Sequence, residues 1–260
     1  MTQVHNPARE RLVKNELAIG VGVRHARSVE IAKAMRAAGF DWLFLDLEHS
    51  SMSLDTAGQI SVAALDAGIA PIVRVPMMQL TMATRALDGG ALGIVMPHVD
   101  TVEDARAIAD ALRYPPAGHR SIAGALAHFN FRSPPVPEVV RILNEATLVV
   151  AMLETPRAIE NADAIAAVPG IDVLLIGTSD LSLELGIPGQ LGHEKIVDAY
   201  ARMIAAARKH GKWPGMGGVY TIPEATRYIG MGARFLLGGN DLSLLMAAAT
   251  ERASALRAIG

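Results

Sequence analysis

Short apolar runs rich in Val, Ile and Leu recur along the chain and alternate with longer amphipathic stretches. This alternation is typical of parallel β-strands joined by crossover helices. It predicts eight strands, at residues 17–23, 42–48, 70–76, 93–99, 148–154, 173–179, 213–219 and 234–239. Eight strand–helix units favour a closed barrel over an open doubly wound sheet. We therefore expect an α/β fold, a single (β/α)8 TIM barrel with a short N-terminal helix, forming one domain over residues 1–260.

Turn and capping residues divide these stretches. One predicted helix begins after Ser28 and stops at Gly39, and another begins after Ser53 and stops at Gly68. Residues 113–135 break the rhythm with four prolines and two glycines. They predict a long loop at the barrel mouth, which could include a short helix.

Composition narrows the class of protein. Hydrophobic residues make up 51% of the chain and aromatic residues only 4%, which indicates an aliphatic α/β core. A net charge of -2 provides no basic field for nucleic acid, and the absence of cysteine excludes disulfides, zinc–thiolate sites and thiol nucleophiles. The N-terminal segment is polar, and no apolar run approaches the ~18 residues of a membrane span. We expect a cytoplasmic protein without nucleic-acid or membrane partners.

Barrel enzymes carry their catalytic residues at the carboxyl ends of the strands. Glu154 and Asp180 follow two consecutive predicted strands. Two carboxylates cannot share a dry pocket unless one is protonated or a cation lies between them. They suit Mg²⁺, Mn²⁺ or Co²⁺, with water and substrate oxygens completing the coordination shell. The alternative is that each carboxylate caps the helix after it.

His49 and Arg74 are candidates for the chemistry beside this pair. His49 follows Asp46 by three residues, so the carboxylate could orient the imidazole as a proton carrier. The alternative is an ordinary packed or loop histidine. Arg74 lies in an apolar strand and needs an anion, either a substrate carboxylate or a developing enolate oxygen. The structural alternative is a buried ion pair with Asp46, Glu48 or Glu154, and both could hold in turn.

A Schiff-base mechanism needs a desolvated lysine inside the barrel. None of the five lysines lies at the carboxyl end of a predicted strand. A metal rather than an imine is therefore expected to stabilise the enolate. His98 has no acid close in sequence and is expected to line the pocket as a wall residue.

Five segments together resemble one family: residues 38–50 (AGFDWLFLDLEHS), 71–76 (PIVRVP), 114–120 (YPPAGHR), 153–155 (LET) and 176–182 (IGTSDLS). They are similar to the class II pyruvate aldolases of the HpcH/HpaI family, which include 4-hydroxy-2-oxoheptanedioate and 2-dehydro-3-deoxyglucarate aldolases. The resemblance covers nearly the whole chain. It implies a divalent-metal-dependent lyase that cleaves or forms 4-hydroxy-2-oxo acids through a pyruvate-type enolate and an aldehyde.

The resemblance also implies roles for particular residues. Glu154 and Asp180 match the family's metal ligands, His49 and Asp46 its catalytic dyad, and Arg74 its substrate-binding arginine. Asp88 matches an acid that reaches the site from a neighbouring subunit. Because members are typically hexamers, the resemblance implies a homo-oligomer.

Some positions depart from the family pattern. Met152 replaces a usual glutamine, and Thr178 and Ser179 replace the Pro-Ala of the segment that carries the methyl pocket and backbone donors. We expect all three to line the substrate site. Ser51 and Ser121 also replace the customary proline and glycine. Two alternatives stay open: an oxaloacetate decarboxylase or acyl-CoA lyase using the same enolate, and a non-catalytic 2-oxo-acid-binding barrel that lost turnover through Met152.

Overall fold

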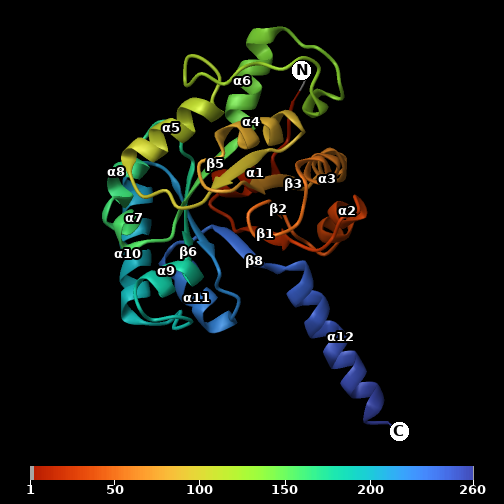
Figure 1. Ribbon diagram of the computed structural model, residues 1–260, viewed down its shortest axis with the longest axis vertical. Helices are drawn as coiled ribbons and strands as arrows, with labels where there is room; N and C mark the ends of the chain where they lie inside the picture. Colours follow the sequence, from red (N-terminus) through yellow and green to blue (C-terminus); the bar gives the residue numbers. More distant parts are fainter. Residues whose placement is uncertain (1–2, 260) are drawn as a thin grey trace.

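The computed structural model describes residues 3–259 and contains a closed barrel of eight parallel strands, paired in chain order (Figure 1). The predicted (β/α)8 fold is confirmed. The strands are β1 Ala18–Val23, β2 Trp42–Asp46, β3 Ala70–Arg74, β4 Gly93–Met96, β5 Leu148–Leu153, β6 Val173–Gly177, β7 Trp213–Gly217 and β8 Phe235–Asn240.

Helices follow the strands, and the predicted short N-terminal helix precedes them. They are α1 Pro7–Val13, α2 Glu30–Ala37, α3 Leu54–Ala67, α4 Leu80–Asp88, α5 Val102–Leu112, α6 Val136–Ala146, α7 Pro156–Glu160, α8 Ala162–Ala166, α9 Thr178–Glu184, α10 Glu194–Lys209, α11 Ile222–Met231 and α12 Asp241–Arg257. The predicted boundaries of α3 are reproduced, because Ser53 caps its first turn and Gly68 ends it in the left-handed conformation.

The barrel interior is filled by side chains from alternate strand positions. Trp42 of β2 stacks on Phe235 of β8 with ring centroids 4.1 Å apart, and it fills the space next to β1. A Cβ atom at Gly20 would overlap the Trp42 indole, so β1 carries glycine where the ring lies. The interior is therefore a packed core, and a substrate can approach only at an end of the barrel.

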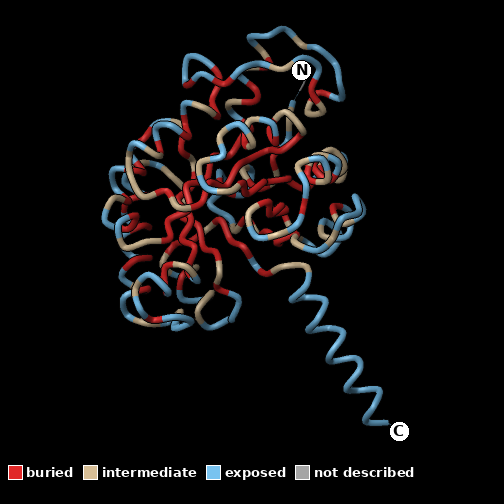
Figure 2. The backbone as a smooth tube through the Cα atoms, in the orientation of Figure 1, coloured by how far each residue is buried: buried red, intermediate tan, exposed pale blue. Residues whose placement is uncertain are grey.

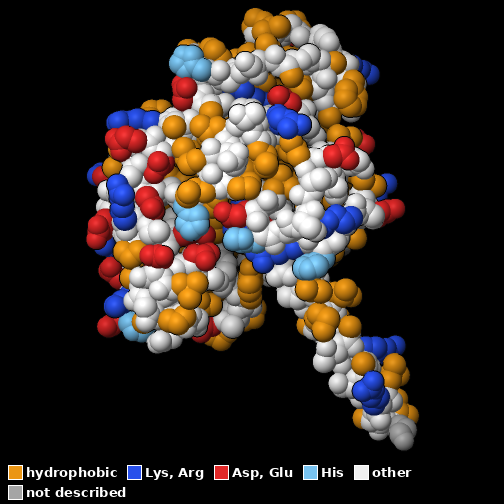
Figure 3. All heavy atoms as spheres, viewed as in Figure 1, with side chains coloured by type: hydrophobic (Ala, Val, Ile, Leu, Met, Phe, Trp, Pro, Cys, Tyr) orange, Lys and Arg blue, Asp and Glu red, His pale blue; other side chains and the backbone are white. Residues whose placement is uncertain are grey.

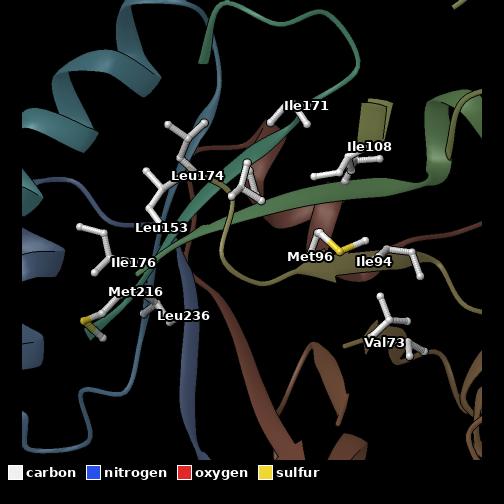
Figure 4. Packing of buried hydrophobic residues seen from close by; sticks show 14 of the residues in the cluster. Val73, Ile94, Met96, Ile108, Leu153, Ile171, Leu174, Ile176, Met216 and Leu236 are labelled. Atoms are coloured by element: carbon white, nitrogen blue, oxygen red, sulfur yellow. The ribbon is translucent and has the colours of Figure 1, made fainter. Parts of the chain in front are cut away.

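A second, larger core lies between the barrel wall and the helices. Val73 of β3 and Ile94 of β4 are paired in register and both point outward into it (Figure 4). Aliphatic side chains dominate this layer, as the low aromatic content predicts. Burial of such side chains contributes about 1.5–3 kcal/mol each.

The loop at residues 113–135 was expected at the barrel mouth, and this expectation is wrong. The loop connects α5 to α6, and α5 runs back along the barrel from the end of β4, so the loop lies at the amino-terminal end. His128 Nε2 hydrogen-bonds to the carbonyl of Ala91, just before β4, and Arg113 donates to the carbonyl of Thr147, just before β5. The expected short helix is a 3₁₀ turn at Ala127–Phe129.

α12 does not pack back on the barrel. None of its residues is buried, and it projects from the body as a separate rod (Figures 1 and 2). Leu245 and Met246 are 64% and 55% exposed. Among residues 3–259, no helix is both long and apolar enough to cross a lipid bilayer. Helices with apolar side chains are normally stabilised by packing against another apolar surface. The apolar side chains of α12 lack such contacts here.

Candidate active site

A buried ion pair connects the ends of β2 and β3. Asp46 and Arg74 are paired in register, and Arg74 donates from Nε to Oδ1 at 3.0 Å and from Nη2 to Oδ2 at 2.7 Å. Nη1 of Arg74 lies 3.1 Å from Oε2 of Glu48. The structural alternative for Arg74 is thus present with Asp46 and Glu48, while two N–H groups on its Nη atoms remain for a substrate.

The charge of Arg74 decides the protonation state of Asp46. Burial alone would raise the pKa of Asp46, but the hydrogen bonds and positive charge of Arg74 outweigh it and hold the pKa at about 2. The carboxylate is therefore ionised at neutral pH. Two guanidinium groups share it, because Arg24 also donates from Nε to Oδ2 at 2.8 Å.

The expected side-chain pairing of Asp46 with His49 is not formed. Oδ1 of Asp46 accepts the main-chain N–H groups of Glu48 and His49, each at 3.1 Å, and its other acceptor positions are taken by arginine. The His49 imidazole is 54% exposed, and its Nε2 atom lies 3.8 Å from Oε2 of Glu48. Asp46 thus holds the loop after β2 in place, and Glu48 is the carboxylate nearest to the imidazole.

Glu154 directly follows β5, and Asp180 lies in the first turn of α9, the helix after the neighbouring strand β6. Glu154 is 1% exposed, and its Oε2 atom accepts the main-chain N–H of His98 at 3.0 Å. Burial raises the pKa of Glu154 to about 8, and the negative charge of Asp180 adds to the effect. A cation between the two carboxylates would reverse both contributions.

The donor chemistry at Glu154 and Asp180 suits a hard divalent cation. Between residues 3 and 259 no group of three acid, histidine or cysteine side chains is arranged to hold a metal, so protein ligands would be these two carboxylates alone. Oε1 of Glu154 lies against Gly177, where a Cβ atom would overlap it. The remaining coordination positions would fall to water and substrate oxygens, as hard cations with few protein ligands require.

His98 is closer to the acids than its sequence context indicated. It was expected as a wall residue without an acid, yet its Nδ1 atom lies 3.6 Å from Oε2 of Glu154. Its backbone has a φ of 51°, which is uncommon for a residue other than glycine. This conformation points the His98 N–H at the buried carboxylate.

The three positions that depart from the family pattern have different surroundings. Met152 is buried at the end of β5, with its methyl group beside Gly177 and Glu154. Ser179 is exposed in the first turn of α9. The Thr178 side chain is fully buried, donates to the carbonyl of Gly217 at 2.7 Å and meets the Tyr200 hydroxyl at 2.8 Å. The side chain of Thr178 is thus not available to a substrate, contrary to expectation.

Asp88 lies far from these residues within the chain. It ends α4 at the amino-terminal end of the barrel, where Arg120 donates to its Oδ1 atom at 2.8 Å. The structure does not bring it to the same end as His49 and Glu154. Its expected role could only be filled by Asp88 of another subunit.

Two further residues at the mouth, Arg24 and Tyr220, were missed from the sequence. Arg24 follows β1, Asp241 begins α12 and accepts the Arg24 N–H at 3.2 Å, and Tyr220 follows β7. Burial raises the pKa of Tyr220, while the nearby charges of Arg24 and Arg74 lower it. The rule that strand ends carry function could have found Arg24. Figure 3 shows basic, acidic and histidine side chains gathered near the middle of one face, where α12 leaves the body.

The barrel and the polar residues at its carboxyl end are those of an aldolase-type carbon–carbon lyase, and comparison with known proteins bears this out. The chain belongs to the HpcH/HpaI aldolase/citrate lyase family, whose profile matches residues 25–248.

The chain is similar to named aldolases and to a solved structure over nearly its whole length. It is 38% identical to 4-hydroxy-4-methyl-2-oxoglutarate aldolase tasA of Hapsidospora irregularis, covering 100% of this chain and 97% of that protein. It is 39% identical to 4-hydroxy-4-methyl-2-oxoglutarate aldolase cghB of Chaetomium globosum, covering 94% and 92%. The crystal structure of an HpcH/HpaI aldolase from Desulfitobacterium hafniense DCB-2 superposes with a TM-score of 0.88 at 28% identity, covering 96% and 95%.

Proposed function

We propose that this protein is a divalent-metal-dependent aldolase that cleaves or forms 4-hydroxy-2-oxo acids. The observation that carries the proposal is the buried Glu154 at the mouth of the barrel, whose pKa is raised to about 8 by burial, with a further contribution from the charge of Asp180. Such a carboxylate pair is costly unless a cation accompanies it. The names of the similar aldolases support the choice of a 2-oxo acid as substrate.

Glu154 and Asp180 would hold the ion, Mg²⁺, Mn²⁺ or Co²⁺, which when bound supplies a Lewis acid for the carboxylate and carbonyl of the 2-oxo acid. Arg74 is fixed by Asp46 and Glu48, and its remaining N–H groups would donate to the oxygen that becomes negative in the enolate. Met152 would form an apolar wall beside Glu154. The main chain at Thr178 and Ser179 would border the donor half of the substrate.

His49 is proposed to move the proton. In the cleavage direction it would accept the proton of the C4 hydroxyl while the C3–C4 bond breaks. The electron pair of that bond then enters the enolate of the departing 2-oxo acid, and the C4 carbon leaves as a carbonyl product. The exposed imidazole next to Glu48 is placed at the mouth, where an acceptor would enter.

The experiment follows pyruvate release from a 4-hydroxy-2-oxo acid before and after exhaustive treatment with EDTA. We expect activity to be lost and then restored by Mn²⁺ or Mg²⁺, while Glu154→Gln protein stays inactive with either ion. The exposed Glu160 on α7 gives the control variant Glu160→Gln, which should behave as the wild type. Undiminished activity after chelation would contradict the role of the metal. Release of CO₂ without an aldehyde or ketone would instead identify a decarboxylase using the same enolate.

We also propose a homo-oligomer, a hexamer by similarity to the family, in which Asp88 of one subunit completes the site of another. Two observations support it. Asp88 lies at the end of its own barrel opposite to His49, and α12 leaves the body with its apolar side chains uncovered.

A further inference from the structure

Arg24 presents free hydrogen-bond donors at the barrel mouth. Its Nε atom donates to Oδ2 of Asp46 at 2.8 Å, and its side chain is 37% exposed. Within residues 3–259, no acceptor is hydrogen-bonded to its Nη1 or Nη2 atoms. The outer edge of the guanidinium is therefore open to a ligand.

The position of Arg24 is held from two sides. The Asp241 carboxylate accepts the main-chain N–H groups of Arg24, His25 and Ala26, at 3.2, 2.8 and 2.7 Å. Arg27 donates from Nη1 to the Arg24 carbonyl at 2.8 Å. With its Nε atom fixed by Asp46 as well, Arg24 loses less conformational freedom on binding a ligand than an ordinary surface arginine does.

Arg24 lies beside Arg74, the arginine proposed to bind the enolate oxygen. Arg24 and Arg74 donate to the same oxygen of Asp46, so their two guanidinium groups flank one carboxylate. Arg74 is buried against Glu48, whereas Arg24 is on the solvent side of the pair. The two acids, Asp46 and Glu48, balance the charges of the two arginines. The attraction of Arg24 for a ligand thus comes from its directed donors.

We propose that Arg24 binds a carboxylate on the acceptor half of the substrate and so determines specificity. This inference rests on the proposed aldolase function. A guanidinium with two free Nη atoms matches a carboxylate in a two-point contact. Because Arg24 and Arg74 share one oxygen, the acceptor carboxylate belongs close to the enolate oxygen, at C4 of the 4-hydroxy-2-oxo acid. The preferred acceptor is therefore a short 2-oxo acid rather than a simple aldehyde.

A matched pair of substrates tests this specificity. 4-Hydroxy-2-oxoglutarate carries a carboxylate at C4, and 4-hydroxy-2-oxovalerate carries a methyl group there, while both release pyruvate. We expect the wild type to favour the first in kcat/KM. Arg24→Gln should lose about 10- to 100-fold with the diacid, chiefly in KM, and less than about threefold with the monoacid. Arg24→Lys should recover part of the loss, and Arg106→Gln, an exposed arginine on α5, should match the wild type.

Some results would contradict the role of Arg24 alone, and another would contradict the aldolase function. Equal losses of kcat/KM on both substrates would mean that Arg24 acts only through Asp46. No loss on either would mean that Arg24 contacts neither substrate. Each result overturns the inference. A wild type with the same kcat/KM for the two substrates overturns it without any variant. A wild type that releases pyruvate from neither, with metal present, contradicts the aldolase function itself.

Discussion

At the scale of single residues, the mouth of the barrel holds two buried carboxylates with opposite protonation. Asp46 has a pKa of about 2 because Arg74 outweighs its burial, so its contribution to stability is present above its ordinary value of 3.8 and is lost as the pH falls towards 2. Glu154 is buried beside another acid, and its pKa is raised from 4.5 to about 8. The metal-free folded protein therefore takes up a proton at Glu154 that the unfolded chain does not bind at neutral pH.

The raised pKa of Glu154 gives the first prediction. Since the folded state binds more protons than the unfolded state between about pH 4.5 and about pH 8, this group makes the metal-free protein less stable as the pH rises through that window. Glu154→Gln should raise the free energy of unfolding of EDTA-treated protein by about 1–3 kcal/mol at about pH 8, and by much less at about pH 5.5. Urea unfolding at both pH values measures it.

Added Mn²⁺ provides the control for this experiment. The ion should stabilise the wild type, because it binds the folded state, and leave Glu154→Gln nearly unchanged. If the variant were less stable than the metal-free wild type at the higher pH, the buried charge of Glu154 would not be what destabilises the metal-free protein.

At the scale of elements, the ends of β5 and β6 approach so closely that one position must be glycine. A Cβ atom at Gly177 would overlap Oε1 of Glu154 and the Met152 methyl group. Gly177→Ala should therefore displace the carboxylate, lower the free energy of unfolding by about 1–3 kcal/mol, and reduce kcat at least about tenfold. Gly230→Ala on α11 is the matched control, because nothing lies within 4 Å of its added methyl group. It should stabilise the protein by about 0.5–1 kcal/mol without loss of activity. An active Gly177→Ala enzyme would contradict the proposed position of Glu154.

The starts of the strands could be predicted from the sequence, whereas their ends and several side-chain contacts could not. Strand starts such as Trp42 and Ala70 were predicted to the residue, because buried apolar runs begin abruptly there. Several strand ends were predicted about two residues too late, since at Leu47 and Glu48 the chain has already turned into the mouth loops. The pairing of Asp46 with Arg74 was kept open and is present, but its sharing with Arg24 depends on the register of β1 against β2, which periodicity does not contain. The Thr178 side chain was misjudged because its partners, Tyr200 and Gly217, come from distant segments.

At the scale of the whole molecule, α12 does not cover β8, the strand that it follows, although helices surround the strands of such a barrel. Gly238 on β8 is exposed, and Ile19 and Phe40 beside it are only half-buried. α12, which follows β8, projects into solvent instead of covering this strip (Figure 1). If α12 packs on the uncovered strip of a second copy, the barrel wall and the apolar side chains of the helix are buried at once.

This arrangement predicts that α12 holds the oligomer together. Light scattering after size-exclusion chromatography should give a multiple of 27.5 kDa for the wild type. The double substitution Leu245→Glu and Met246→Glu should shift the mass towards one subunit and lower the melting temperature by at least about 4 °C, because charges replace side chains that the partner would bury. Arg252→Gln, an exposed polar change on the same helix, is the control and should leave the mass unchanged. A wild type that is monomeric at working concentrations would contradict the packing of α12 on a second copy. It would also leave Asp88, at the far end of its barrel, without a site to complete.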